Sequence, residues 1–294
     1  MTQIDYLIIN DMTQLGTLTV GRKNQITIMG ILNLSPESFY KNSIKSTKSQ
    51  IIKHVKQLEE DGADIIDIGG MSTAPYLKTI VSEKVETERV TKTIKIIHTS
   101  SNLPISVDTC RASVAKDALE LGADVINDIS GLKYDNQMPK IIAKYEPSVI
   151  LCAYGKNAVS GNHMLITKKL LNESVKIAQK CNIPTNKIVL DPAIGFFRRS
   201  SDVKNKLPYT KINSDWAQRD IEIIKNLKSL KTKYPLLVSI SNKSFLGKLL
   251  KKDDPSDRNI GTALAEMTSI FNGASIIRTH NPKITSDVIK MTKL

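Results

Sequence analysis

Hydrophobic and polar positions follow one another in a repeated order along this chain. A short, almost wholly apolar run ends in polar residues, and a longer stretch with apolar residues at helical spacing follows it. Short continuous apolar runs are typical of strands that are buried on both faces, as in parallel sheets. Strands are therefore expected at 26–33, 63–70, 104–109, 125–129, 148–154, 187–193, 235–241 and 275–280.

Helical patterns follow these runs, and helices are expected at 46–61, 82–99, 111–122, 136–146, 166–182, 215–232, 256–272 and 285–293. Eight strands that are each followed by a helix predict an α/β fold of the TIM (β/α)8 barrel type, in which the parallel sheet closes on itself. The alternative is an open doubly wound sheet, which needs a glycine-rich phosphate loop after an early strand. The only candidate loop, IGGMST at 68–73, lacks the GxGxxG spacing, so the barrel is favoured.

The N-terminal segment precedes the repeats. Residues 5–22 are expected to form two short strands joined by a turn, so that 1–24 is a hairpin that caps the N-terminal end of the barrel. A chain of 294 residues with 40% hydrophobic content can bury one sizeable core. No linker or charge shift indicates a second domain, and a single domain over 1–294 is predicted.

The formal net charge of +13 bears on the expected partners of the protein. The lysines are scattered along helical segments such as 227–234 and form no dense block, so no nucleic-acid partner is expected. A lysine-rich solvated surface is the better interpretation. Such a basic field would still help to gather an anionic small substrate.

The chain has no expected membrane segment or secretory leader. No apolar run approaches the roughly 20 residues that span a bilayer, and the acidic start MTQIDYLIINDM lacks the pattern of a signal peptide. Cys110, Cys152 and Cys181 are an odd set without CxxC spacing, which favours free thiols in a reducing compartment. A cytoplasmic location is expected.

Polar side chains at the strand ends are the candidates for chemistry. Asp67, Asp108, Asn127, Asp191 and Lys243 all fall at or just beyond the end of an expected strand. In a closed barrel these ends converge on one mouth. Carboxylate and amide groups there can pair with a flat, nitrogen-rich heterocycle, since they accept from ring N–H and amino groups. The alternative is that each residue only caps the next helix or turn.

The eighth expected strand ends in a second pattern, SIIRTHN at 275–281, which carries Arg278 and His280. An arginine and a histidine at the end of the last strand suit an anion such as phosphate, which barrels often hold in that region. A structural ion pair is the alternative for Arg278.

The motifs resemble those of the dihydropteroate synthase family of pterin-binding barrels, as a divergent member. MGILNLSPESF at 29–39 is similar to the family's MGILNVTPDSF, and DIIDIGGMST at 64–73 is similar to its DIGGESTRPG. ISVDT, INDISG, LDPAIGF, NKSFLG and IIRTH follow in the family's order, and the agreement spans 26–282. The family joins an aryl amine to a hydroxymethyl-dihydropterin pyrophosphate and releases pyrophosphate.

The resemblance implies three groups of binding residues. The pterin would be bound by Asp108, Asn127, Asp191 and Lys243. Of these, Asp108, Asp191 and Lys243 are also the catalytic candidates. The pyrophosphate group is Asn33, Arg278 and His280, and the aryl-amine group is Ser244 and Phe245. A magnesium ion would bind with the pyrophosphate at Asn33. The resemblance also implies a homodimer.

Departures from the family pattern concern the leaving group and the acceptor. Ala74 and Asn242 stand where the family has arginines, and Glu37 replaces an aspartate. Less positive charge favours an aryl amine without a carboxylate, as in archaeal methanopterin-type pathways, over 4-aminobenzoate. The alternative is that Lys41, Lys78 or another loop lysine replaces the missing positive charge, so that the choice of acceptor is unchanged.

Two other functions remain open at this point. A pterin-dependent methyltransferase, which passes a methyl group to a cobalamin protein, needs the pterin cleft but no pyrophosphate site. A non-catalytic pterin-binding protein would tolerate the missing arginines. For the synthase, the polar loops at 34–46 and 71–82 are expected to be mobile without ligand and to close over the charged intermediate.

Overall fold

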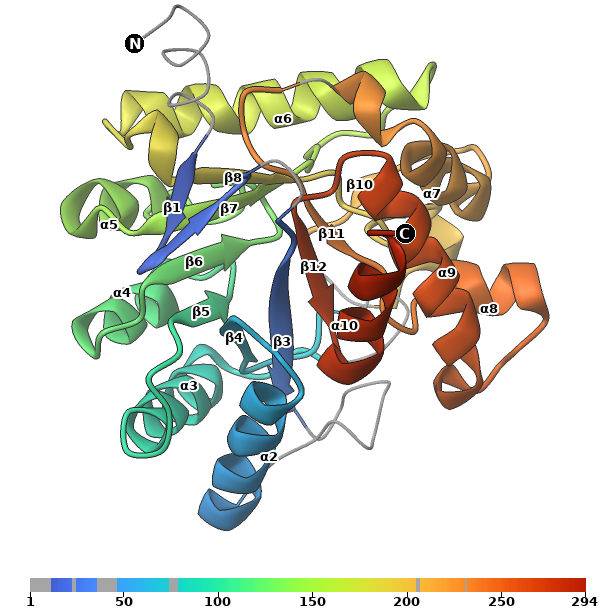
Figure 1. Cartoon of the computed structure of the whole chain (residues 1–294). Coiled ribbons are helices and arrows are strands. Elements are labelled where there is room, and N and C mark those ends of the chain that lie inside the picture. Colours follow the sequence, from blue (N-terminus) through green and yellow to red (C-terminus); the bar gives the residue numbers. More distant parts are fainter. Residues whose placement is uncertain (1–11, 23–24, 36–46, 74–78, 205–206, 231) are drawn as a thin grey trace, which may run out of the picture.

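Eight parallel strands form the centre of the molecule (Figure 1). The computed structural model describes residues 12–22, 25–35, 47–73, 79–204, 207–230 and 232–294. The strands are β3 (Thr27–Asn33), β4 (Ile65–Gly69), β5 (Ile105–Asp108), β6 (Val125–Asp128), β7 (Ser148–Cys152), β8 (Ile188–Asp191), β11 (Leu237–Ser239) and β12 (Ile276–Thr279). They are hydrogen-bonded in the order β11-β12-β3-β4-β5-β6-β7-β8, and a parallel bridge between Leu190 and Leu236 joins the two edge strands. The predicted TIM barrel is confirmed.

The helices surround this sheet on the outside (Figure 1). They are α2 (Lys48–Glu60), α3 (Glu83–Ile97), α4 (Ala112–Glu120), α5 (Met138–Tyr145), α6 (His163–Lys180), α7 (Trp216–Lys225), α8 (Ser244–Leu250), α9 (Asn259–Phe271) and α10 (Pro282–Met291). The sequence patterns indicated all of them except α8. The helix predicted at 215–232 ends at Lys225 and is followed by a 3-10 turn, η4 (Leu227–Leu230). No helix in the described part of the chain is long and apolar enough to cross a bilayer.

Two further pairs of short strands lie outside the barrel sheet. β1 (Thr13–Leu15) and β2 (Leu18–Val20) form the predicted antiparallel hairpin. The Ser148 hydroxyl, at the start of β7, donates to the carbonyl oxygen of Gln14 over 2.8 Å, so the hairpin lies at the N-terminal ends of the strands. β9 (Phe197–Arg198) pairs in parallel with β10 (Thr210–Lys211) and was not predicted.

An apolar layer closes the bottom of the barrel interior. It is made of strand residues and of two hairpin residues, and its members are Leu15, Val20, Met29, Ile65, Val125, Ile150, Val189, Leu237 and Ile276. Each of these side chains is at most 1% exposed. Burying one such side chain stabilises the fold by roughly 1.5–3 kcal/mol. The hairpin therefore covers the N-terminal end of the barrel and excludes water from its interior at that end.

A polar layer lies directly above the apolar one. Strand side chains alternate between two faces, so a residue two positions beyond an interior residue also faces the interior. In β4 this step leads from Ile65 to Asp67, and in β12 it leads from Ile276 to Arg278. The same step places Asn127, Cys152, Asp191 and Ser239 in this layer. The regular two-residue period of the strands thus carries the polar candidates toward one end of the barrel.

Candidate active site

Asp67 is the centre of a buried polar network in this layer. Its side chain is fully buried, and its Oδ2 forms an ion pair of 2.6 Å with Nε of Arg278. The Ser106 hydroxyl donates to Oδ1 over 2.6 Å, and the Asn127 amide donates to Oδ2 over 3.3 Å. Three donors converge on one carboxylate, which holds the side chains of Arg278 and Asn127 in place. Asp67 was grouped with the strand-end residues from its sequence, but no role was assigned to it.

Asp108 is the second carboxylate that Arg278 contacts. Nη2 of Arg278 lies 2.9 Å from Oδ2 of Asp108. Burial raises the pKa of Asp108 to about 7, against the opposing effect of Arg278 and with a further contribution from Asp67. Its other oxygen, Oδ1, is buried and has no hydrogen-bond partner among the described residues. Asp108 therefore combines one oxygen bound to Arg278 with one that can accept from a ligand.

Asn127 presents a second buried acceptor beside Asp108. The two residues are paired across β5 and β6. Oδ1 of Asn127 is buried and, within the described part of the chain, receives no hydrogen bond. A buried acceptor without a donor costs roughly 1–3 kcal/mol. A flat ligand with neighbouring N–H groups would recover that free energy at both positions.

Arg278 is shared between two carboxylates. Burial alone would lower its pKa, but the carboxylates of Asp67 and Asp108 outweigh burial and hold the pKa of Arg278 above its ordinary value. It therefore stays positively charged. Its side chain is still 14% exposed, so the guanidinium can also reach a ligand. Its contact with pyrophosphate stays a prediction.

His280 and Asn33 lie together at the adjacent ends of β12 and β3. Nε2 of His280 is 3.4 Å from Nδ2 of Asn33, and Nδ1 is 3.0 Å from the Ser241 hydroxyl. Burial, with the nearby charges of Arg278 and other cations, lowers the pKa of His280 to about 3. The imidazole is therefore neutral at pH 7. If His280 meets an anion, it does so as a hydrogen-bond donor and not as a second positive charge.

Lys243 and Asp191 belong to the same polar cluster as Asp67, Asp108, Asn127 and Arg278. The Lys243 ammonium donates to the carbonyl oxygen of Ile194 and lies 4.7 Å from the centre of the Phe196 ring. Burial lowers the pKa of Lys243 to about 8, and Asp191 opposes that shift. Burial also raises the pKa of Asp191, whose Oδ1 accepts a hydrogen bond from the backbone of Ala193 over 2.7 Å.

Gly195 is required for the approach of Lys243 to this segment. Its φ is +89°, in the left-handed region, and a Cβ atom there would lie 2.8 Å from Cδ of Lys243. Any side chain at this position would displace the lysine.

The predicted aryl-amine residues are placed differently from one another. Ser244 is half-buried, whereas Phe245 is only 1% exposed and packs in the core between sheet and helices. The contact of the Phe245 ring with the aryl amine therefore stays a prediction. Phe196 is half-buried and faces Lys243, so it is a second aromatic side chain that can flank a ligand. It lies in the LDPAIGF motif, but sequence analysis assigned it no role.

Asn242 does not line the site. It is 3% exposed, its φ is +57°, and its Oδ1 accepts a hydrogen bond from the Thr262 hydroxyl over 3.3 Å. The conformation is one that asparagine tolerates better than most residues. The Asn242 side chain itself therefore makes no contact with an acceptor, and the effect of the missing arginine on the local charge stays a prediction. Ala74, Glu37, Lys41 and Lys78, and most of the two loops expected to be mobile, lie outside the described residues.

Asn33 is the predicted magnesium ligand, and it can supply one oxygen of the ion's coordination shell. Among the described residues, no group of three or more His, Cys, Asp or Glu side chains could hold a metal ion. The half-buried Asn33 offers one amide oxygen at the end of β3. Magnesium prefers oxygen ligands and commonly takes most of them from substrate phosphates and water. One amide oxygen is therefore compatible with that manner of binding.

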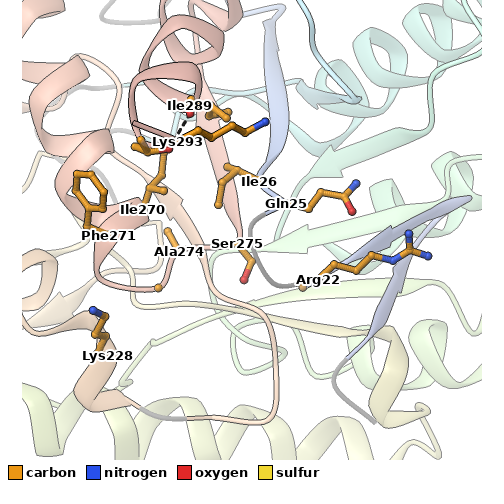
Figure 2. Close-up of a pocket in the computed structure, with 13 residues that line it drawn as sticks. Arg22, Gln25, Ile26, Lys228, Ile270, Phe271, Ala274, Ser275, Ile289 and Lys293 are labelled. Atoms are coloured by element: carbon orange, nitrogen blue, oxygen red, sulfur yellow. Dashed lines mark hydrogen bonds between the residues drawn. The ribbon is translucent and has the colours of Figure 1, made fainter. Parts of the chain in front are cut away.

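A separate hollow of about 960 Å³ lies at the opposite end of the barrel (Figure 2). Its lining includes Ile26 and Ser275, which precede β3 and β12, and the side chains of Arg22, Lys228 and Lys293. Since it lies at the N-terminal ends of the strands, the apolar layer separates it from the polar cluster.

Comparison with known proteins agrees with this geometry. A family model described as pterin binding enzyme matches residues 29–280. The chain belongs to this family. It is 36% identical over 275 residues to the dihydropteroate synthase of Bacillus subtilis, covering 92% of this chain and 88% of the relative. The protein is therefore a pterin-binding transferase with small-molecule substrates.

Solved structures of dihydropteroate synthases share the fold of this pterin-binding enzyme. The enzyme of Yersinia pestis, in a sulfonamide drug complex, has a TM-score of 0.82 and 28% identity, with 96% of this chain and 97% of that one covered. The enzyme of Xanthomonas albilineans, solved with 4-aminobenzoic acid, has a TM-score of 0.79 and 26% identity, with 94% of each chain covered.

Proposed function

We propose that this protein condenses hydroxymethyl-dihydropterin pyrophosphate with 4-aminobenzoate and releases pyrophosphate. The observation that carries the proposal is the pair of buried acceptors without donors, Oδ1 of Asp108 and Oδ1 of Asn127. A pterin edge offers an amino group next to a ring N–H, which are the donors that these atoms need. Asp191 and Lys243 complete the cluster with one further acceptor and one cation.

The reaction needs little covalent chemistry from the protein. The amine nitrogen forms a bond to the pterin methylene carbon, the bond from that carbon to the pyrophosphate oxygen breaks, and the oxygen leaves with the electron pair. The proton that the amine loses passes to solvent or to pyrophosphate. The side chains hold the pterin and stabilise the departing anion, with Arg278 as the cation and with neutral His280 and Asn33 as hydrogen-bonding groups. Magnesium, when bound with the substrate at Asn33, would neutralise further charge on the leaving group.

The choice of 4-aminobenzoate over an archaeal-type arylamine follows from two observations. Asn242, one of the two positions that motivated a modified acceptor, is buried in a turn and bonded to Thr262. The relative from Xanthomonas albilineans binds 4-aminobenzoic acid. An arylamine with a sugar-like substituent is the competing acceptor, and it is measured in the same turnover assay.

Calorimetry tests the pterin site first. Binding of pterin pyrophosphate with magnesium should be much tighter than binding of the pterin alone, because only the former engages Arg278 and Asn33. A methyltransferase would show no such dependence on pyrophosphate, and a non-catalytic binder would bind without turnover. Asp191→Asn should weaken pterin binding, since it removes the negative charge and turns one carboxylate oxygen into a donor. Lys180→Gln, on the far end of α6, is the control and should bind as the wild type does.

We also propose that the protein forms a homodimer through α9. Ile260, Leu264 and Phe271 lie on one face of this helix, at i, i+4 and i+11, and are 72%, 60% and 53% exposed. An exposed apolar stripe of this kind is typical of an interface. Light scattering should give twice the chain mass for the wild type and the single mass for Leu264→Glu. A wild-type monomer at micromolar concentration would contradict the dimer.

A cytoplasmic location is proposed on the cysteines. Cys110, Cys152 and Cys181 are free thiols in the structure, and the first two are buried. Burial raises the pKa of Cys110 and of Cys152 well above the usual range, so both thiols are unreactive. Three cysteines without a disulfide agree with a reducing compartment.

A further inference from the structure

A buried group of two arginines and one aspartate lies behind the acceptor side of the site. Arg198, Arg219 and Asp220 are 2%, 0% and 0% exposed. Both guanidiniums approach the same carboxylate, Arg219 at 3.0 Å and Arg198 at 3.8 Å. One carboxylate cannot neutralise two cations, so the group carries a net positive charge close to the site.

Arg198 contacts the residue that is expected to meet the aryl amine. Nη2 of Arg198 donates to the Ser244 hydroxyl over 2.8 Å, and Nη1 donates to the carbonyl oxygen of Phe197 over 2.8 Å. The guanidinium also stacks on the Trp216 ring, with its carbon 3.9 Å from the ring centre. Burial, stacking and two hydrogen bonds fix the position of Arg198 before any ligand binds.

The hydrogen bond from Arg198 decides what Ser244 can do. A hydroxyl has one proton and two lone pairs. When a guanidinium N–H occupies a lone pair, the proton of the hydroxyl points elsewhere and is available to an acceptor. Within the described part of the chain, Arg198 is the one hydrogen-bond partner that Oγ of Ser244 has. Ser244 is therefore prepared to donate, and the nearby positive charge makes an anionic acceptor the preferred one.

The charge around this side of the site supports the same conclusion. Lys243, Arg198 and Arg219 face two carboxylates, Asp191 and Asp220, which leaves one positive charge in excess. The outer ion pair of Lys248 with Asp215, at 2.6 Å, is neutral and does not change that balance. Arg198 thus supplies charge on the acceptor side of the site, where the departures at Ala74 and Asn242 suggested a deficit.

We propose that Arg198 is a positioning residue that orients the Ser244 hydroxyl and makes the acceptor site selective for an aryl amine that bears a carboxylate. This inference rests on the proposed synthase function and extends it to the specificity of the acceptor. A neutral aryl amine of the same shape can accept from the Ser244 hydroxyl through a carbonyl oxygen, but it gains nothing from the positive charge.

Steady-state kinetics with two acceptors tests the role of Arg198. The acceptors are 4-aminobenzoate and its neutral analogue 4-aminobenzamide, at saturating pterin pyrophosphate and magnesium. Arg198→Met keeps an unbranched side chain over Trp216 but removes the charge and the hydrogen bond. It should raise KM for 4-aminobenzoate at least tenfold with kcat nearly unchanged, and it should raise KM for 4-aminobenzamide far less. Arg198→Lys should restore most of the loss, since it restores the charge.

A double substitution and a neighbouring control separate this role from a purely structural one. Ser244→Ala should raise KM for 4-aminobenzoate to a similar extent, and the combination with Arg198→Met should add little, because both remove the same contact. Arg199→Met, at the exposed neighbour that pairs with Asp202 at 3.5 Å, should behave as the wild type does. Equal rises of KM for both acceptors in Arg198→Met, or no rise, would overturn the inference while leaving the synthase function intact. Absence of turnover in the wild type would instead overturn the proposed function.

Discussion

Replacing Asp67 by asparagine tests whether the buried network holds the site together. The carboxylate accepts from Ser106 at 2.6 Å, from Asn127 at 3.3 Å and from Arg278 at 2.6 Å. An amide of the same shape keeps one acceptor atom and turns the other into a donor. If the amide nitrogen faces the partners of Oδ2, it opposes two N–H donors, whereas if it faces Ser106 the hydroxyl can turn and accept from it. In either orientation Arg278 keeps only Asp108 as its charged partner.

The expected loss follows from the burial of this ion pair. Asp67 is fully buried and Arg278 is 14% exposed, so water cannot replace the lost partner. Breaking a buried ion pair by removing one partner typically costs 3–5 kcal/mol. We expect the free energy of unfolding of Asp67→Asn to fall by about 3 kcal/mol, toward the lower end because Asp108 still neutralises Arg278.

Urea denaturation at pH 7 measures this loss, with Asp117→Asn as the control. Asp117 is 40% exposed and lies 3.6 Å from Lys116, so its ion pair is screened by solvent and its removal should cost under about 1 kcal/mol. Pterin affinity, measured on the folded protein, should also fall in Asp67→Asn because Asn127 loses its fixed orientation. A stability loss as small as that of the control, with unchanged pterin affinity, would refute the network as a support of the site.

Three further predictions concern the ionisation of Asp108 and Glu266 and the glycine at position 195. Pterin affinity should rise as the pH increases through about 7, because burial raises the pKa of Asp108 to about 7 and the ligand needs the carboxylate form. Calorimetry between pH 5.5 and 8.5 measures this rise, and a flat profile would contradict it. Burial raises the pKa of Glu266 in α9 from 4.5 to about 7, so its proton stabilises the fold below pH 4.5 and that stabilisation is lost as the pH rises to 7. Glu266→Gln should therefore stabilise the protein at pH 8 by up to about 3 kcal/mol and by little at pH 4.5, as thermal unfolding at both pH values would show. Gly195→Ala should weaken pterin binding and lower the melting temperature, because the φ of Gly195 is +89° and the added methyl group would push Lys243 away. Unchanged pterin binding in that variant would show that this position does not require glycine.

Much of the fold follows from local patterns in the sequence. The strands of the barrel are buried on both faces, and each is a short apolar run that ends in a polar residue, as in ISVDT at 105–109. α8 was missed because its seven residues follow the seventh strand directly and are too few to show a helical period. β9 and β10 were not predicted for the same reason, since a strand of two residues shows no alternation of apolar and polar positions.

The partners within the site depend on contacts that the sequence does not contain. Arg278 meets Asp67 across 211 positions and Asp108 across 170 positions of the chain, through the register of a closed sheet. Strand-end placement predicted that these residues share a mouth. It could not predict that Arg278 already binds two carboxylates, or that His280 is neutral because it is buried beside a cation. The burial of Phe245 likewise depends on how α8 packs, which the motif alone does not determine.

The two interior layers of the barrel explain how one fold can hold such a costly cluster. Burying Asp67, Arg278 and Asp108 carries a desolvation penalty, which their mutual contacts oppose. Directly below, the apolar layer from Leu15 to Ile276 contributes favourable burial at every strand it includes, and the hairpin completes it. In β4 and β12 both layers lie on the same face of the strand, two residues apart, so the stabilising layer also fixes the spacing of Asp67 and Arg278. The unsatisfied acceptors on Asp108 and Asn127 therefore remain in place without ligand, and binding can use that free energy because folding has already supplied the rigidity.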